Sequence, residues 1–182
     1  MLNDKELPTT LQKAIQFFSD DLTCIKFIAS RRWAEGLAIC PRCQSDNNTF
    51  MESRKVWQCK NKECKKQFSV KVGTIFEDSP IGLDKWLTAV WLIVGAKNGI
   101  SSYEIHRAIG ITQKSAWFMM HRIRVAMATG SFEKLFGLYL DEQIYRFDER
   151  KSNDRDRFLG VLEAVSGKRL TYDELRGYQT SH

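Results

Sequence analysis

Apolar residues recur every three or four positions near the start of the chain, at Leu11, Ile15, Phe18, Leu22, Ile25 and Ile28. This spacing places side chains on one face of an α-helix. Three polar residues at 19–21, with Asp20 in the middle, interrupt the pattern and offer an N-cap, because a short polar side chain can accept a bond from a free N–H of the first turn. The pattern predicts two short N-terminal helices.

A different pattern occupies residues 58–76. Apolar and polar residues alternate there, and β-branched or aromatic side chains stand at Phe68, Val70, Val72 and Ile75. This alternation is typical of strands. We expect small β-hairpins in this segment.

Helical spacing returns in the strongly apolar segment 83–97, which ends at Asn98 and Gly99, a common helix stop. A short helix is then expected over 102–109, since Ser101 and Glu104 have capping-box spacing and Gly110 follows the last turn. A longer helix is expected over 113–127, with Thr112 as its N-cap. Two helices joined by a glycine turn, the second longer than the first, are typical of helix-turn-helix DNA readers.

The pattern beyond about residue 137 predicts a helical tail. Apolar residues have helical spacing over 140–147 and 158–165, and Thr171 and Glu174 have the form of a capping box. Four apolar tail residues are expected to be exposed and to need a partner: Leu138, Leu140, Ile144 and Phe147. A homodimer formed through the tail is therefore predicted.

Four of the five cysteines form two close pairs. Cys40 and Cys43 enclose two residues, Cys59 and Cys64 enclose four, and fifteen residues separate the pairs. Four thiolates at this spacing can close a tetrahedral, structural zinc site, with reduced free thiols as the alternative. Cys24 lies on an apolar helical stripe and is expected to be a buried free thiol.

Charge is distributed unevenly along the chain, whose formal net charge is +6. Residues 1–130 carry 19 Lys and Arg against 12 Asp and Glu, whereas residues 131–182 carry 9 against 10. Seven of the cations lie in one short segment: Arg54, Lys55, Lys60, Lys62, Lys65, Lys66 and Lys71. A cluster of this kind is suited to DNA phosphates.

The longer helix of the helix-turn-helix has two distinct sides. Its predicted buried stripe is Ala116, Met120, Ile123 and Met127. On the other side we expect base contacts from Gln113, Lys114 and Ser115 in the first turn, and phosphate contacts from Arg122 and Arg124. The alternative is an ordinary helical hairpin with a solvated basic face.

These residues resemble a known family. The run CPRC, then QCKNKECKKQFSVKVGTIFEDS, then WLTAVWLIVGAKNGISSYEIHRAIGITQKSAWFMMHRIRVAM is similar to the front half of bacterial insertion-sequence transposases of the ISXO type, over about residues 10–137. The resemblance implies that this half binds the ends of the element, with Cys40, Cys43, Cys59 and Cys64 as zinc ligands. It also implies a ribonuclease-H-like nuclease domain in the intact family, in which two aspartates and a glutamate hold two divalent metals.

The rest of the chain resembles the far end of the same family rather than its nuclease core. LYLDEQIYRFDERKSNDRDRF and GVLEAVSGKRLTYDELRG look like the family's tail, so the chain looks like an internally deleted member joined near Gly137. Asp141 is a weak candidate for the first catalytic aspartate. A solvated helix face is the favoured interpretation, since only 41 residues follow Asp141.

The predicted fold is α-rich with a small β zinc ribbon and no complete ribonuclease-H-like nuclease core. Its expected segments are an N-terminal helical segment at 1–35, the zinc ribbon at 36–79, the helix-turn-helix domain at 80–130 and the remnant tail at 131–182. No apolar run reaches the roughly 18 residues that span a bilayer, and the first residues lack the features of a secretory signal, so a cytoplasmic location without a membrane partner is expected.

The function predicted from the sequence is that of a transposase-derived protein that binds double-stranded DNA at terminal inverted repeats without cutting it. It could form a homodimer or associate with a full-length transposase, as a regulator or as a decaying remnant. One alternative is an active transposase, with Mg²⁺ as cofactor if nuclease activity is retained, possibly complemented in trans. Another is a zinc ribbon used for protein contacts.

Overall fold

The computed structural model describes residues 7–33, 36–128 and 135–175, and its elements follow the sequence pattern closely. The helices are α1 (Leu11–Phe17), α2 (Asp21–Arg32), α3 (Leu83–Gly95), α4 (Ser102–Ile109), α5 (Gln113–Met127), α6 (Leu135–Asp148), the 3₁₀ helix η2 (Glu149–Lys151), α7 (Asp154–Glu163) and α8 (Tyr172–Leu175). The strands are β1 (Asn48–Met51), β2 (Val56–Cys59) and β3 (Gln67–Phe68). The predicted α-rich fold with a small β ribbon is confirmed.

Helix boundaries lie where the capping residues predicted them. Asp20 accepts from the N–H of Thr23 at the start of α2. The reciprocal bonds between Ser101 and Glu104 form the capping box of α4, and Gly110, with a φ of 62°, ends that helix in the left-handed region. Thr112 caps α5. These local signals fix the turn between α4 and α5.

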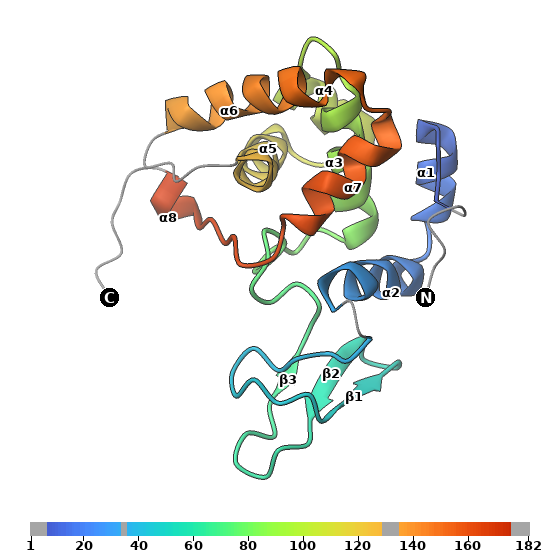
Figure 1. Cartoon of the computed structure of the whole chain (residues 1–182), viewed down its shortest axis with the longest axis vertical. Coiled ribbons are helices and arrows are strands. Elements are labelled where there is room, and N and C mark those ends of the chain that lie inside the picture. The colour runs from blue at the N-terminus through green and yellow to red at the C-terminus, as the bar shows by residue number, and fades with distance from the viewer. Residues whose placement is uncertain (1–6, 34–35, 129–134, 176–182) are drawn as a thin grey trace.

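The ribbon is a three-stranded antiparallel sheet in the order β1-β2-β3, at the lower end of the molecule in Figure 1. Trp57 lies opposite Phe50 on one side and Phe68 on the other. Trp33 at the end of α2 packs on Trp57, with ring centroids 5.0 Å apart. These aromatic rings form the small core of the ribbon, and they join it to α2.

Of the β-hairpins expected over residues 58–76, the pairing of β2 with β3 is present, and strand structure ends at Phe68. Residues 70–73 form turns, in which the N–H of Thr74 bonds to the carbonyl of Lys71. Val70 and Ile75 are nevertheless buried. The alternation therefore reflects apolar side chains that enter the core from a turning segment, and not a strand.

Helix α5 lies in the middle of the helical part, with α6 beside it and α3 and α7 on the right in Figure 1. From Met119 to Met127, only Val125 is not buried. A helix that is buried all round is a core helix. The tail therefore packs on α5, which both α6 and α7 contact.

The tail is part of the central hydrophobic core. Phe158 on α7 packs against Phe18, Phe27 and Trp91, with ring centroids 5.0–6.2 Å away. After α7, the carbonyl of Val165 accepts from the N–H of Ile75, in the segment that leads from the ribbon to α3. Residues from both ends of the chain thus share one core.

The sheet of the ribbon is the only sheet in the part of the chain that the structure describes, and no large nuclease core is evident there. Ile144 and Phe147 on α6 are 45% and 65% exposed, as expected, while the side chains of Leu138 and Leu140 lie outside the described residues. Within the described ranges, no helix has the length and apolar character needed to cross a bilayer. The division at residues 35, 79 and 130 stays a prediction.

Candidate zinc centre and nucleic-acid interface

Two turns of similar shape present three of the four clustered thiols, those of Cys40, Cys43 and Cys64. In the first, the N–H of Gln44 bonds to the carbonyl of Cys40, and Gln44 has a φ of 58°. In the second, the N–H of Lys65 bonds to the carbonyl of Asn61, and Lys65 has a φ of 46°. Asn61 therefore takes the place that Cys40 has in the first turn.

The unequal spacing of the two cysteine pairs has a structural explanation. Cys59 is the last residue of β2, two positions before the turn that carries Cys64. The strand end directs the third thiol toward the cluster, so that this ligand does not come from the turn itself. The wider spacing of the second pair is compatible with a compact site.

The sulfur positions fit a tetrahedral zinc ion. Sγ of Cys40 lies 3.8 Å from that of Cys64, Sγ of Cys43 lies 3.6 Å from that of Cys59, and all four lie within 4.8 Å of one another. Zinc–sulfur bonds of about 2.3 Å in a tetrahedron require sulfurs about 3.8 Å apart. The four cysteines form a structural Zn²⁺ site, as predicted.

The first turn also favours the ionised form of its thiol. Burial raises the pKa of Cys40, but hydrogen bonds from the backbone N–H groups of Cys43 and Arg42, together with those to the thiols of Cys43 and Cys64, lower that pKa to about 7. A thiolate is the form that binds zinc. With four sulfur ligands the ion has no open position, so it would supply folding free energy rather than catalysis.

Cys24 is separate from the cluster. Its thiol is fully buried on α2 and donates to the carbonyl of Phe18, with a sulfur–oxygen distance of 3.2 Å. Burial raises the pKa of Cys24 to about 12. The expectation of a buried free thiol is confirmed.

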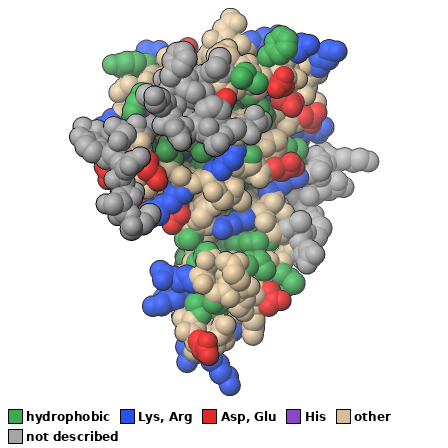
Figure 2. Space-filling view, turned by 60° about the vertical axis from the view of Figure 1, so that its left-hand side comes forward, with side chains coloured by type: hydrophobic (Ala, Val, Ile, Leu, Met, Phe, Trp, Pro, Cys, Tyr) green, Lys and Arg blue, Asp and Glu red, His purple; other side chains and the backbone are tan. Residues whose placement is uncertain are grey.

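The four lysines of the ribbon that are predicted to contact DNA are exposed in the structure. Lys60, Lys62, Lys65 and Lys66 surround the second cysteine pair and are all exposed. In Figure 2, Lys and Arg side chains gather on the lower lobe, which the ribbon forms. This group is called the ribbon lysines below.

Two further cations of the predicted patch have roles within the protein. Lys55 forms an ion pair of 2.6 Å with Asp21. Lys71 donates to the carbonyls of Ser79 and Ile81, and burial lowers its pKa. Lys71 therefore holds the segment before α3 and is removed from the patch.

The first turn of α5 is the part of that helix open to solvent. Lys114 is exposed, whereas Gln113 and Ser115 are half-buried. The side-chain amide of Gln113 donates to Oγ of Ser102 on α4, at 2.9 Å. Contact of these three residues with bases stays a prediction.

The expectation that Arg122 and Arg124 reach phosphates is corrected by their burial. Their exposed fractions are 3% and 5%. Arg122 donates to the carbonyl of Glu77 and lies over the rings of Trp86 and Phe118. Arg124 forms an ion pair with Glu142 of α6. Because α6 and α3 cover this side of α5, both guanidinium groups make contacts inside the protein and are not available to phosphates.

Asp141 and Glu142 occupy neighbouring positions on α6 with different surroundings. Asp141 is 6% exposed rather than solvated, which corrects the expected solvated face, and burial raises its pKa. Glu142 is 2% exposed and contacts both Arg124 and Arg146 at 2.5 Å. We call Arg124, Glu142 and Arg146 the buried ion triad. The i,i+4 pair of Glu142 and Arg146 lies within α6, but Arg124 comes from α5, 18 residues away, and the sequence pattern gave no sign of that contact.

Comparison with known proteins supports the interpretation of the ribbon. Residues 19–67 match the transposase zinc-ribbon domain, a segment that includes α2 and all four zinc ligands. The chain is thus a transposase-related zinc-ribbon protein, related to insertion sequences.

One curated relative of the chain belongs to a transposable element. The chain is 27% identical over 116 residues to an uncharacterized protein in the transposable element ISH50 of Halobacterium salinarum. The match covers 62% of this chain and 38% of the relative, so the chain spans well under half the length of that protein. No solved structure matches the chain.

Proposed function

We propose that this chain binds double-stranded DNA at the ends of an insertion element and does not cut it. The main observation that supports this proposal is the match to the transposase zinc-ribbon domain, whose second cysteine pair is surrounded by exposed lysines. Clustered cations favour binding to a duplex because each contacted phosphate releases condensed counterions. The ribbon lysines would supply affinity.

The helix-turn-helix would supply the sequence preference through a limited surface. The accessible part of α5 runs from Gln113 to Phe118, about 9 Å of helix at 1.5 Å per residue. On α4, Tyr103, 62% exposed, and Arg107 are also accessible to solvent. The first turn of a recognition helix is the part that contacts base edges in this motif.

Binding without cleavage is supported by the state of Glu142, one of the two neighbouring carboxylates of α6. Both oxygens of Glu142 accept bonds from arginines, which leaves them poor ligands for a divalent metal. Two-metal nucleases need carboxylates directed at the same ions. The buried ion triad instead gives Glu142 a structural role.

DNA binding is tested by fluorescence anisotropy at several salt concentrations. The probes are a duplex from an inverted repeat that flanks the gene and a scrambled duplex of equal length. Replacing the ribbon lysines by glutamine should reduce the slope of log Kobs against log salt by about 0.9 for each phosphate that the protein no longer neutralises. The control replaces Lys13 and Lys151, which are exposed elsewhere, and is compared with a variant that replaces only Lys60 and Lys62, so that each loses two charges.

Two outcomes would overturn the proposal. Weak binding that does not change with salt would favour a ribbon used for protein contacts. Strand nicking of the repeat by the pure chain with Mg²⁺ would favour an active transposase. If the proposal holds, added chain should lower the yield of cleavage by an intact transposase on the same ends, because both compete for them.

A further inference from the structure

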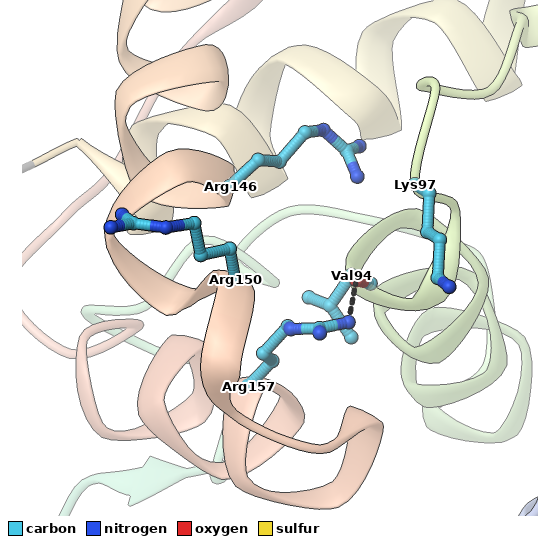
Figure 3. Close-up of a pocket in the computed structure, with 5 residues that line it drawn as sticks. All are labelled: Val94, Lys97, Arg146, Arg150 and Arg157. Carbon is cyan, nitrogen blue, oxygen red and sulfur yellow. Dashed lines mark hydrogen bonds between the residues drawn. The ribbon is translucent and has the colours of Figure 1, made fainter.

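A cationic cavity lies where α3 ends and the tail crosses it. It has a volume of about 310 Å³ and is lined by Val94, Lys97, Arg146, Arg150 and Arg157. Four of these five residues are cationic and none is acidic. In Figure 3, Arg146 and Arg157 extend from the tail toward the gap, Lys97 borders it from the other side, and Arg150 turns outward.

The two inner arginines are held in place by the backbone of α3. Arg146 donates to the carbonyls of Ile93 and Ala96, and Arg157 donates to the carbonyl of Val94, shown as a dashed line in Figure 3. Their rotamers are therefore fixed before any ligand arrives. A fixed guanidinium loses little entropy when it binds an anion.

Charge is only partly balanced around the cavity. Glu142 pairs with Arg146, and Asp154 pairs with Arg157. Lys97 and Arg150 are exposed and have no carboxylate partner among the residues that the structure describes. Arg150 lies over the ring of Phe147, 4.1 Å from its centroid, and keeps most of its N–H donors available. One uncompensated positive charge, that of Lys97, thus borders the cavity, and a second, that of Arg150, lies at its outer edge with the guanidinium directed outward.

We propose that this cavity binds a phosphate group and that its source is the DNA backbone. Lys97 and Arg150 would provide charge-assisted donors, and the inner arginines would add to the positive field. The cavity is larger than a phosphate group, so it has room for a phosphate that belongs to a larger polyanion. This site is separate from the ribbon lysines and from the first turn of α5.

The position of the cavity favours a backbone phosphate. Lys97 lies five residues before Ser102, the first residue of α4. In helix-turn-helix proteins the first helix crosses the DNA backbone while the second reads bases. A phosphate bound at Lys97 would thus fix the register of the duplex against α4 and α5. This choice of source, unlike the anion site itself, rests on the proposed function.

The experiment has two arms, both on the zinc-loaded full chain. Isothermal titration calorimetry measures the affinity of the cavity for pyrophosphate in the absence of DNA. The salt dependence of duplex binding measures how many DNA phosphates the protein neutralises. The test variant combines Lys97→Gln and Arg150→Gln, which lie at the mouth rather than in the buried ion triad. The control combines Lys151→Gln, next to Arg150, with Lys13→Gln, so that net charge is matched.

The test variant should bind pyrophosphate about tenfold more weakly and should lower the DNA salt slope by about 0.9, while the control changes neither. Loss of pyrophosphate binding with an unchanged slope would overturn the DNA source and leave a site for a free phosphate compound. Equal pyrophosphate binding in the test and control variants would overturn the site. Because the titration needs no DNA, failure of duplex binding in the unmodified chain would count against the proposed function and the DNA source, and not against the anion site.

Discussion

Replacing Glu142 by alanine tests the most charged part of the interior. Arg124 and Arg146 both contact this carboxylate at 2.5 Å, and the side chains of Arg124, Glu142 and Arg146 are 7%, 3% and 10% exposed. The substitution leaves two guanidinium groups close together in a region with little water. Breaking a buried ion pair from one side costs about 3–5 kcal/mol.

That cost is large beside the total stability of a domain, which is about 5–15 kcal/mol. For a chain of this length it corresponds to a fall in Tm of roughly 6–20 °C. The assay is urea unfolding of the zinc-loaded chain, followed by circular dichroism at the helix signal. Glu142→Gln keeps the shape and one acceptor oxygen, so it should lose less than Glu142→Ala.

The control is Asp148→Ala, because Asp148 is an exposed acid on the same helix. That change should stay within about 0.5 kcal/mol. If Glu142→Ala were no more harmful than Asp148→Ala, the reasoning would be refuted. The two guanidinium groups would then regain water or other partners once the carboxylate is removed, so that neither stays a buried unpaired charge.

Three further predictions concern the metal, an interior histidine and a turn. Removing zinc with a chelator, or Cys43→Ser, should lower the unfolding midpoint seen by tryptophan fluorescence, since structural zinc supplies on the order of 10 kcal/mol of binding free energy; an unchanged midpoint would contradict this. Burial, then the charge of Arg124, lowers the pKa of His121 to about 4. The unfolded chain therefore binds the proton first, and stability should fall by up to about 3 kcal/mol as pH drops from 6.5 to 4. His121→Gln should flatten that part of the pH profile, and an equally steep profile would count against it. Gly110→Ala should cost roughly 1–2 kcal/mol in urea unfolding because of its left-handed backbone, and Gly110→Asn less; equal stability of all three would rule out that cause.

Local signals made much of the fold predictable from the sequence. Capping residues such as Ser101 and Thr112 fix helix starts through bonds that span three residues. The zinc ligands were predictable for the same reason, because thiol spacing along the chain carries the information. The wider second pair needed the structure, since the strand end at Cys59 replaces a turn position.

Interactions between distant segments were not predictable in this way. Arg122 and Arg124 stand on what looks like the polar side of α5, and only the packing of α6 and α3 shows that both are buried. A helix examined alone gives no information on which neighbour will cover it. The tail showed the same limit: Arg146 and Arg157 look like solvated charge in the sequence, yet both bond to the end of α3.

Because Cys24 is separate from the zinc cluster, the reactivity of the five thiols can report metal loss and unfolding separately. In the zinc-loaded folded chain, four thiolates are bound to metal and the fifth is buried with a pKa of about 12. A thiol reagent at neutral pH should therefore react slowly with all five. Reaction of four thiols would report loss of the metal, and reaction of the fifth would report opening of the helical core around α2. One colorimetric titration can then follow demetallation and unfolding as separate events in the same sample.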